Sequence, residues 1–394
     1  MQKKHFFKRL LTPVLLALAL ICLLIAFLLF RQLGVFDDRY ESVREYAALL
    51  GKIDEVYIGE YEVDDIAAAA MHATVDALGD RWSYYLTPEE YVAYLDDVNN
   101  RFTGIGVNVV VDDEPGGMRV TSVFRGSAAE TAGIVAGDVI VGIDGVDIAG
   151  WVLDEMKALL SRPIGEAADL TVLRADGSIV LLTVEYGYVF VDPVSFEMLD
   201  DHIGYIAISN FDRGAAQSFI SAVKELMEQE AEAIVFDVRG NGGGLLVEMA
   251  AMLDYLLPEG EIFVAVDKSG REDITYSDAD SVSLPFAVLI NRYSFSAAEY
   301  FAAMLREYDA AVLVGEQTTG KNRMQTTVDL PGGGALHISS SQYLTKNRVS
   351  LYDVGGVAPD FPVAMAEDDL IELFSGNLDK KDDLQLQQAI AVLR

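Results

Sequence analysis

The fold of this chain is decided by the stretch Ala233-Ile234-Val235-Phe236-Asp237-Val238-Arg239, which runs into Gly240-Asn241-Gly242-Gly243-Gly244. The apolar run predicts a buried strand, and the glycines predict a sharp turn into a helix over residues 245–257. Strands and helices alternate on both sides. We expect strands at 203–208, 286–290 and 311–314, and helices at 215–227 and 296–308. This alternation predicts an α/β domain.

A serine and a lysine in this region stand where they could react together. Ser296 starts a predicted helix, and Lys321 follows the next predicted strand. A serine nucleophile needs a base, histidine is scarce in this chain, and a buried lysine is one of the few alternatives. A solvated lysine has a pKa near ~10.4 and stays protonated at neutral pH, so this base needs apolar surroundings.

The same region offers donors for a negatively charged oxygen. The N–H of Ala297 lies at the start of the predicted helix, where the helix dipole favours negative charge. The loop 242–244 could supply a second N–H. No Gly-Lys-Ser follows this loop, so nucleotide binding is a poor alternative.

Residues 101–186 change character to short β-rich runs with many glycines. The opening Phe102-Thr103-Gly104-Ile105-Gly106-Val107 and the later stretches 127–133, 137–140 and 143–145 together resemble a PDZ domain. In such a domain, the N–H groups of Ile105 and Gly106 receive a peptide's terminal carboxylate, and Val107 begins the strand that pairs with the peptide. The alternative is that these glycines only form turns.

The N-terminal part contains an apolar segment and a helical segment. Residues 10–30 carry no charge and are long enough to span a bilayer, and Lys3, Lys4, Lys8 and Arg9 precede them. This charge order predicts a single-pass anchor in the cell membrane, with the N-terminus cytoplasmic and the rest outside. A cleaved signal peptide is the alternative. We interpret residues 39–100 as a helical scaffold, with an N-cap at Thr87.

Composition excludes several classes of function. The net charge of −33 argues against a nucleic-acid partner, which needs clustered lysine and arginine. The single cysteine, Cys22, cannot form an intrachain disulfide. The four histidines stand far apart without metal-ligand spacing. We therefore expect no metal and no cofactor.

Taken together, these motifs resemble those of the C-terminal processing peptidases, tail-specific serine peptidases with an embedded PDZ domain. The likeness begins near Glu41. Its ordered landmarks are residues 79–90, Asp237-Val238-Arg239 with the glycine loop, the serine and lysine motifs, residues 356–360 and residues 383–386. The resemblance implies a crotonase- or ClpP-like mixed sheet with helices. The roles that it implies are Ser296 as nucleophile, Lys321 as general base, Gln325 as the residue that orients the lysine, and Gly243 and Ala297 as the oxyanion hole.

Three positions depart from the family's usual pattern. Ala298 stands where a second serine is usual, Asn322 where glycine is usual, and Asn241-Gly242 where Asn-Pro is usual. Ser294 is a competing nucleophile, but its spacing to Lys321 is less favourable than that of Ser296. Glu307 also matches a family position, where we favour a structural role.

We therefore predict six segments: a cytoplasmic tail (1–9), a transmembrane helix (10–30), an N-terminal helical segment (31–100), a PDZ domain (101–186), a serine peptidase core (187–366) and a C-terminal helical tail (367–394). The predicted function is a membrane-anchored serine endopeptidase that cleaves extracytoplasmic proteins or peptides near or from their C-termini. Its expected partners are substrates with free C-termini and the membrane. A homo-oligomer stays open. The alternatives are a PDZ scaffold with impaired catalysis and a crotonase-like acyl enzyme, for which no coenzyme A signal is present.

Overall fold

The computed structural model describes residues 20–28 and 37–394, and the chain divides into two compact units, residues 1–67 and 68–394. In the first unit, the described residues form a helix over 20–28 and helix α2 (Asp37–Val56). Helix α3 (Val63–Asp76) begins in this unit and ends in the second.

The transmembrane anchor predicted over residues 10–30 is corrected by the structure. Among residues 20–28 and 37–394, no helix is long and apolar enough to cross a membrane. The predicted architecture is therefore wrong in its transmembrane helix. Residues 10–19, 29 and 30 of the predicted span lie outside the described residues.

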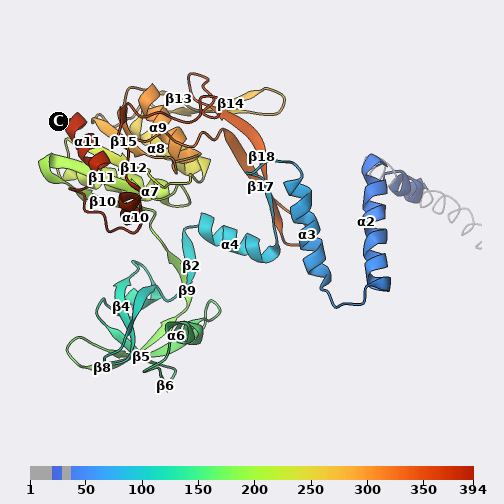
Figure 1. Ribbon diagram of the computed structural model, residues 1–394, viewed down its shortest axis with the longest axis horizontal. Helices are drawn as coiled ribbons and strands as arrows, with labels where there is room; N and C mark the ends of the chain where they lie inside the picture. The colour runs from blue at the N-terminus through green and yellow to red at the C-terminus, as the bar shows by residue number, and fades with distance from the viewer. Residues whose placement is uncertain (1–19, 29–36) are drawn as a thin grey trace, which may run out of the picture. The chain divides into compact units, whose positions relative to one another are not determined.

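The centre of the second unit is a six-stranded sheet with the strand order β10-β11-β12-β15-β16-β19 (Figure 1). Strand β10 is antiparallel to β11, and the other neighbours are parallel. The strands are β10 (Val194–Met198), β11 (Ile203–Ile208), β12 (Ala233–Asp237), β15 (Phe286–Ile290), β16 (Ala311–Gly315) and β19 (Phe361–Pro362). Every residue of β12 and β15 is buried, as expected for central parallel strands that are covered on both faces.

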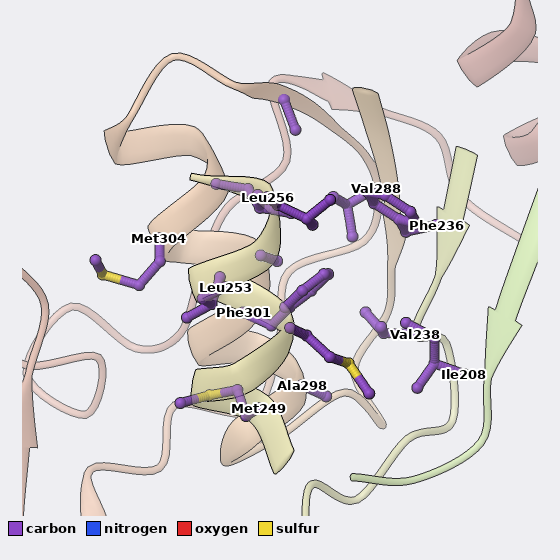
Figure 2. Packing of buried hydrophobic residues seen from close by; sticks show 14 of the residues in the cluster. Ile208, Phe236, Val238, Met249, Leu253, Leu256, Val288, Ala298, Phe301 and Met304 are labelled. Atoms are coloured by element: carbon purple, nitrogen blue, oxygen red, sulfur yellow. The ribbon is translucent and has the colours of Figure 1, made fainter. Parts of the chain in front are cut away.

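Helices cover this sheet on both faces. Helices α7 (Ala215–Glu228), α8 (Leu246–Leu256) and α9 (Ala297–Glu307) share one apolar cluster with the sheet. Figure 2 shows Leu253 of α8 and Phe301 of α9 in this cluster together with Phe236 and Val288 of the strands. The other face is covered by α11 (Leu384–Leu393), which follows α10 (Glu367–Phe374). The predicted α/β core is confirmed.

A second, five-stranded sheet lies against this core and was not foreseen from the sequence. Its order is β1-β18-β13-β14, with β17 also paired to β18. The strands are β1 (Tyr84–Leu86), β13 (Gly260–Val266), β14 (Glu272–Ser277), β17 (Arg323–Asp329) and β18 (Ala335–Leu344). Strand β1 interrupts the segment interpreted as helical, because its aromatic and aliphatic residues pair with the edge of β18. Helix α4 (Pro88–Val98) then begins as predicted, with the Thr87 hydroxyl accepting from the Glu90 N–H.

The PDZ region is a separate antiparallel sheet with its own core. The strand order is β3-β4-β5-β7-β8, and β6 pairs with β5. The elements are β3 (Val107–Asp112), β4 (Gly117–Val123), α5 (Ala128–Thr131), β5 (Val139–Ile143), β6 (Val146–Asp147), α6 (Leu153–Leu160), β7 (Ala167–Leu173) and β8 (Ile179–Glu185). A two-stranded ribbon of β2 (Arg101–Gly104) and β9 (Gly187–Phe190) joins both ends of this module to the rest of the unit. The short helix η1 (Asp200–His202) then precedes β11.

Candidate active site

Ser296 occupies a strained turn between β15 and α9. Its backbone has φ 58° and ψ −122°, a conformation that a non-glycine residue adopts only when the surroundings impose it. Gly243 packs against this turn, and a Cβ on Gly243 would lie 2.8 Å from the Cβ of Ser296. Only glycine fits there. The structure therefore builds a sharp strand-to-helix turn that presents one serine at a helix start.

The competing serine, Ser294, is excluded by its burial. It is fully buried, and its hydroxyl donates to the carbonyl of Val238 at 2.7 Å and accepts from the N–H of Asn291 at 3.1 Å. Ser296 instead lines a cleft. Only Ser296 of this pair is accessible to a substrate.

A buried glutamate, Glu299, connects the serine turn to the lysine loop. One carboxylate oxygen accepts from the N–H groups of Ser296 (3.0 Å) and Lys321 (2.7 Å). The other accepts from the N–H of Gly320 (2.8 Å) and the hydroxyl of Thr318 (2.7 Å). Burial raises the pKa of Glu299, while these hydrogen bonds oppose the shift. All four partners donate, so the arrangement suits the ionised carboxylate and fixes the two loops relative to each other.

Lys321 meets the requirement for a basic amine. It is 8% exposed, and burial lowers its pKa to about 8, although Glu299 and Asp80 act in the opposite direction. Its carbonyl accepts a hydrogen bond from the hydroxyl of Tyr343 at 2.6 Å. Lys321 can therefore hold a useful fraction of free amine near neutral pH.

Both residues line one cleft of about 670 Å³. Its apolar lining includes Met249, Phe263 and Met324. His337 also lines the cleft, but burial and the charge of Lys321 lower its pKa to about 4. An imidazole with so low a pKa is a weak base at neutral pH, so the lysine is the better proton acceptor. Within the described ranges, no cluster of histidine, cysteine, aspartate and glutamate could hold a metal ion.

Comparisons with known proteins agree with this arrangement. Residues 202–363 match the model of peptidase family S41, and residues 96–173 match that of the PDZ domain. The chain is 28% identical to the carboxy-terminal processing protease CtpA of Bacillus subtilis, over 77% of this chain and 65% of that protein. It is 30% identical to the chloroplastic carboxyl-terminal-processing peptidase 2 of Arabidopsis thaliana, over 78% of this chain and 62% of that protein. Residues 202–363 are thus an S41 peptidase region, joined to a PDZ domain.

Within the S41 family, the sequence-based resemblance to the C-terminal processing peptidases is confirmed. The chain spans slightly less than two thirds of the length of both relatives. A crystal structure from Bacteroides fragilis, described as a candidate S41 protease, has a TM-score of 0.51 over 82% of this chain and 89% of that chain. At 18% identity, this likeness concerns the fold alone.

The S41 roles assigned to Gln325 and the oxyanion hole stay predictions. Gln325 lies on β17 and lines the cleft, where its amide donates to the Ser339 hydroxyl and to the carbonyl of Arg323, both at 3.0 Å. Among the described residues, neither Gln325 nor Ser296 forms a hydrogen bond with the Lys321 amine. Ala297 and Gly243 also line the cleft, but the Gly243 N–H donates to the side chain of Asn241 at 2.8 Å.

The predicted PDZ site has a suitable backbone. Ile105 and Gly106 are buried, and their carbonyls accept from the N–H groups of Ala129 (2.8 Å) and Phe124 (3.0 Å). In the part of the chain that the structure describes, the N–H groups of Ile105 and Gly106 have no protein acceptor. Val107 then begins β3. The loop thus offers two donors to an anion such as a carboxylate.

Residues that depart from the family pattern, and Glu307, make packing or hydrogen-bond contacts that stabilise the fold around the site. Ala298 is fully buried in the α9 cluster, where a methyl group packs without a polar atom (Figure 2). The Asn322 amide donates to the Ser350 hydroxyl at 3.0 Å and so holds the lysine loop. Glu307 accepts from the N–H of Asn347 at 3.1 Å, a contact compatible with a structural role.

Sequence reasoning missed two residues of this site. Glu299 is one, and its signal was present, because a serine followed three positions later by glutamate is a helix-start pattern. Trp82 is the other, since its indole lies over the Lys321 amine. No local pattern predicts this contact, because it joins a loop of the N-terminal helical segment to a loop of the core.

Proposed function

We propose that this chain is a serine endopeptidase in which Ser296 is the nucleophile and Lys321 the general base. The observation that carries the proposal is the Glu299 carboxylate, which binds the backbones of both residues and holds them at one cleft. The lowered pKa of Lys321 supports the same assignment. The lysine accepts a proton without any contribution from a histidine.

The reaction proceeds by acyl transfer. The Lys321 amine takes the Ser296 proton while the serine oxygen attacks the carbonyl carbon of the scissile peptide bond. The resulting ammonium gives its proton to the leaving amine, and water then hydrolyses the acyl-enzyme with the lysine again acting as base. Backbone N–H groups at Ala297 and Gly243 stabilise the negatively charged oxygen of the intermediate.

Two adjustments are needed before this reaction. The lysine amine has to come within hydrogen-bonding distance of the Ser296 hydroxyl, and the Gly243 N–H has to leave the Asn241 side chain. Catalytic hydrogen bonds commonly tighten only when a substrate is bound. We infer that substrate binding completes the site.

The PDZ region recognises the substrate's C-terminus in this proposal. The unpaired N–H groups of Ile105 and Gly106, counted within the described residues, suit a terminal carboxylate. The region is inserted between α4, which supplies cleft residues, and the core sheet. An insertion joined at two points can transmit a shift to the cleft, so the PDZ domain selects substrates and can also control the site. A passive docking role is the other outcome of the tests below.

The proposed location of the catalytic part is outside the cytoplasm. It rests on the positive charges at 3–9 before an uncharged apolar run, an order that also fits the signal peptide given above as the alternative to an anchor. Protease added outside intact cells should degrade residues 68–394, whereas their protection would overturn this location.

The deciding experiment compares active protein with Ser296→Ala protein on an unstructured protein substrate and identifies the new C-termini. The proposal is supported if the unchanged protein cleaves the substrate and the Ser296→Ala protein does not. If neither protein cleaves while both bind free-tailed peptides, the chain is a peptide-binding scaffold instead.

A further inference from the structure

Trp82 stands between the catalytic lysine and a second cavity. This cavity, of about 380 Å³, is lined by the loop residues Gly79, Asp80, Arg81 and Trp82 and by Asn322, Arg323, Gln342, Tyr352 and Asp353. Most of these side chains are polar, so water can fill the space. Lys321 lines the catalytic cleft, and its neighbour Asn322 lines the second cavity. The lysine loop therefore has a cavity on either side, and the second of these is the polar one.

The indole of Trp82 contacts both parts of the proposed dyad region. The Lys321 Nζ lies 4.3 Å from the indole centroid. The ring of Phe295, the residue before Ser296, lies 5.7 Å from the same indole between centroids. Trp82 is thus an aromatic cover over the amine and beside the nucleophile turn.

The loop that carries Trp82 is fixed to the same sheet as Gln325. The Ser83 hydroxyl accepts from the Ser339 N–H at 3.0 Å, and the Ser339 hydroxyl accepts from Gln325 at 3.0 Å. Asp80 accepts from the Ser83 hydroxyl at 2.6 Å and pairs with Arg323 at 3.5 Å. These contacts hold the indole in place, so its position over the lysine is built into the fold.

We propose that Trp82 is a positioning residue that seals the Lys321 amine from the second cavity and thereby keeps it usable as a base. This inference rests on the proposed function of Lys321. Exclusion of water disfavours the ammonium form before the reaction. The face of the indole then offers a cation–π contact to the ammonium that forms when the lysine takes the serine proton.

Other charged groups also face Lys321 and must be kept constant. They are Glu299 on α9, Asp80 and Arg81 on the Trp82 loop, and His337 on β18. Glu299 and Asp80 favour the ammonium, whereas Arg81 disfavours it. Substitution of Trp82 leaves all four in the chain. Because the Arg81 guanidinium lies 4.1 Å from the centroid of the same indole, Arg81→Ala protein is the control that separates loss of the cover from movement of this charge.

The first test is the pH dependence of cleavage by Trp82→Ala, Trp82→Leu and Trp82→Phe proteins. Opening the second cavity to the amine should move the rising limb of the kcat/KM profile of Trp82→Ala upward by about one pH unit. At pH 7 this is a loss of about tenfold. Activity should recover at high pH, a response that general misfolding would not give. Trp82→Phe should stay close to the unchanged protein. An unshifted or downward-shifted limb in Trp82→Ala would overturn the proposal.

A second measurement does not depend on proteolysis. The chain has two tryptophans, Trp82 and Trp151, so a Trp151→Phe, Ser296→Ala protein reports emission from Trp82 alone. The emission should change with a midpoint near pH 8 as the charge beside the indole disappears, and Lys321→Met should abolish this transition. Absence of the transition, or its persistence in Lys321→Met, overturns the inference. If Ser296→Ala protein remained proteolytic while the transition was present, the proposed nucleophile would fail but the contact between Trp82 and Lys321 would stand.

Discussion

Two glycine-containing loops of this protein offer backbone N–H groups, but they differ in readiness. In the PDZ loop, the N–H groups of Ile105 and Gly106 have no acceptor among the described residues. In the loop beside Ser296, the Gly243 N–H is already bound to Asn241. Both loops depend on glycine, since Gly106 has φ 90° and Gly243 has φ 98°.

This difference in donor availability suggests that binding of a peptide's C-terminus and catalysis have different structural requirements. A loop with free donors can bind a carboxylate without rearrangement, whereas a loop whose donor is occupied must exchange one hydrogen bond for another. We infer that the chain can hold a substrate tail before its catalytic site is complete. The following experiments disable one loop at a time.

The largest effect is expected for Ser296→Ala, which should remove cleavage by about 10⁴-fold or more while leaving peptide binding to the PDZ loop intact. Lys321→Ala should cost a similar factor, and the double variant little more, because the two residues act as one unit. Single-turnover cleavage and peptide binding would be measured side by side. Ser294→Ala is the control, with retained cleavage and stability lower by about 1 kcal/mol for its lost hydrogen bonds. Loss of cleavage in Ser294→Ala together with activity in Ser296→Ala would reverse the assignment.

Gly243→Ala should lower kcat by about 10²- to 10³-fold, the cost of losing one oxyanion donor. The new Cβ would lie 2.8 Å from the Ser296 Cβ and force the loop away from the nucleophile. Peptide binding by the PDZ loop should not change. Gly270→Ala is the matched control, because Gly270 also has a positive φ, of 82°, but open space around it. Equal losses in both variants would mean that backbone strain alone explains the effect.

The pH profile should rise tenfold per unit until about pH 8, the pKa of Lys321, and then level off, because only the free amine accepts a proton. The same shift affects stability. The pKa of Lys321 is lower in the folded chain than the ordinary 10.5, so the unfolded chain binds more protons between about pH 8 and 10.5. Its contribution to stability therefore increases with pH across this window, and Lys321→Met should remove that increment. A profile that levels off near pH 4 or 5 would instead point to His337.

Gly106→Ala should weaken binding of free-tailed peptides by about tenfold or more and leave kcat on short substrates unchanged. The added Cβ would lie 2.2 Å from the Ser127 Cβ, so the carboxylate loop has to move. Peptide titration into Ser296→Ala protein measures this effect. Gly177→Ala, at φ 82° with open space in the same module, should bind normally. If amidated and free-tailed peptides bind equally well to the unchanged protein, the loop does not read the carboxylate.

The α/β core could be predicted from the sequence because its strands and turns have clear local sequence signals. The apolar run at 233–238 and the glycines after it are enough to predict a buried strand and a turn, and β15 was predicted to the residue. The second sheet was missed because β17 is mostly exposed and β18 mostly half-exposed, without the continuous apolar runs of the core strands. The Trp82 contact was missed because residues 82 and 321 are brought together by that same sheet.

The smallest effect on cleavage is expected for substitution of Asn100, which connects the PDZ ribbon to the loop that contains Asn210. Its side chain exchanges two hydrogen bonds with that of Asn210 (3.1 and 2.8 Å) and donates to the carbonyl of Arg213 at 3.1 Å. Its carbonyl accepts from the N–H of Val191 at 2.7 Å, just beyond β9. Asn100 therefore links the PDZ ribbon to a loop whose Asn210 lines the cleft.

Asn100→Ala should lower stability by about 1–3 kcal/mol, because Asn100 is buried and its half-buried partner Asn210 loses both hydrogen bonds. Cleavage of free-tailed substrates should fall only a few-fold, since no group at the cleft is removed. The informative quantity is the ratio of cleavage rates for free-tailed and amidated substrates. If tail binding acts through this connection, the ratio should approach one in Asn100→Ala while peptide affinity stays unchanged, because a ligand alters activity only through states that it binds unequally. Asn377→Ala, at an exposed asparagine, provides the control. An unchanged ratio in Asn100→Ala would mean that the PDZ domain docks substrates without controlling the site through this residue.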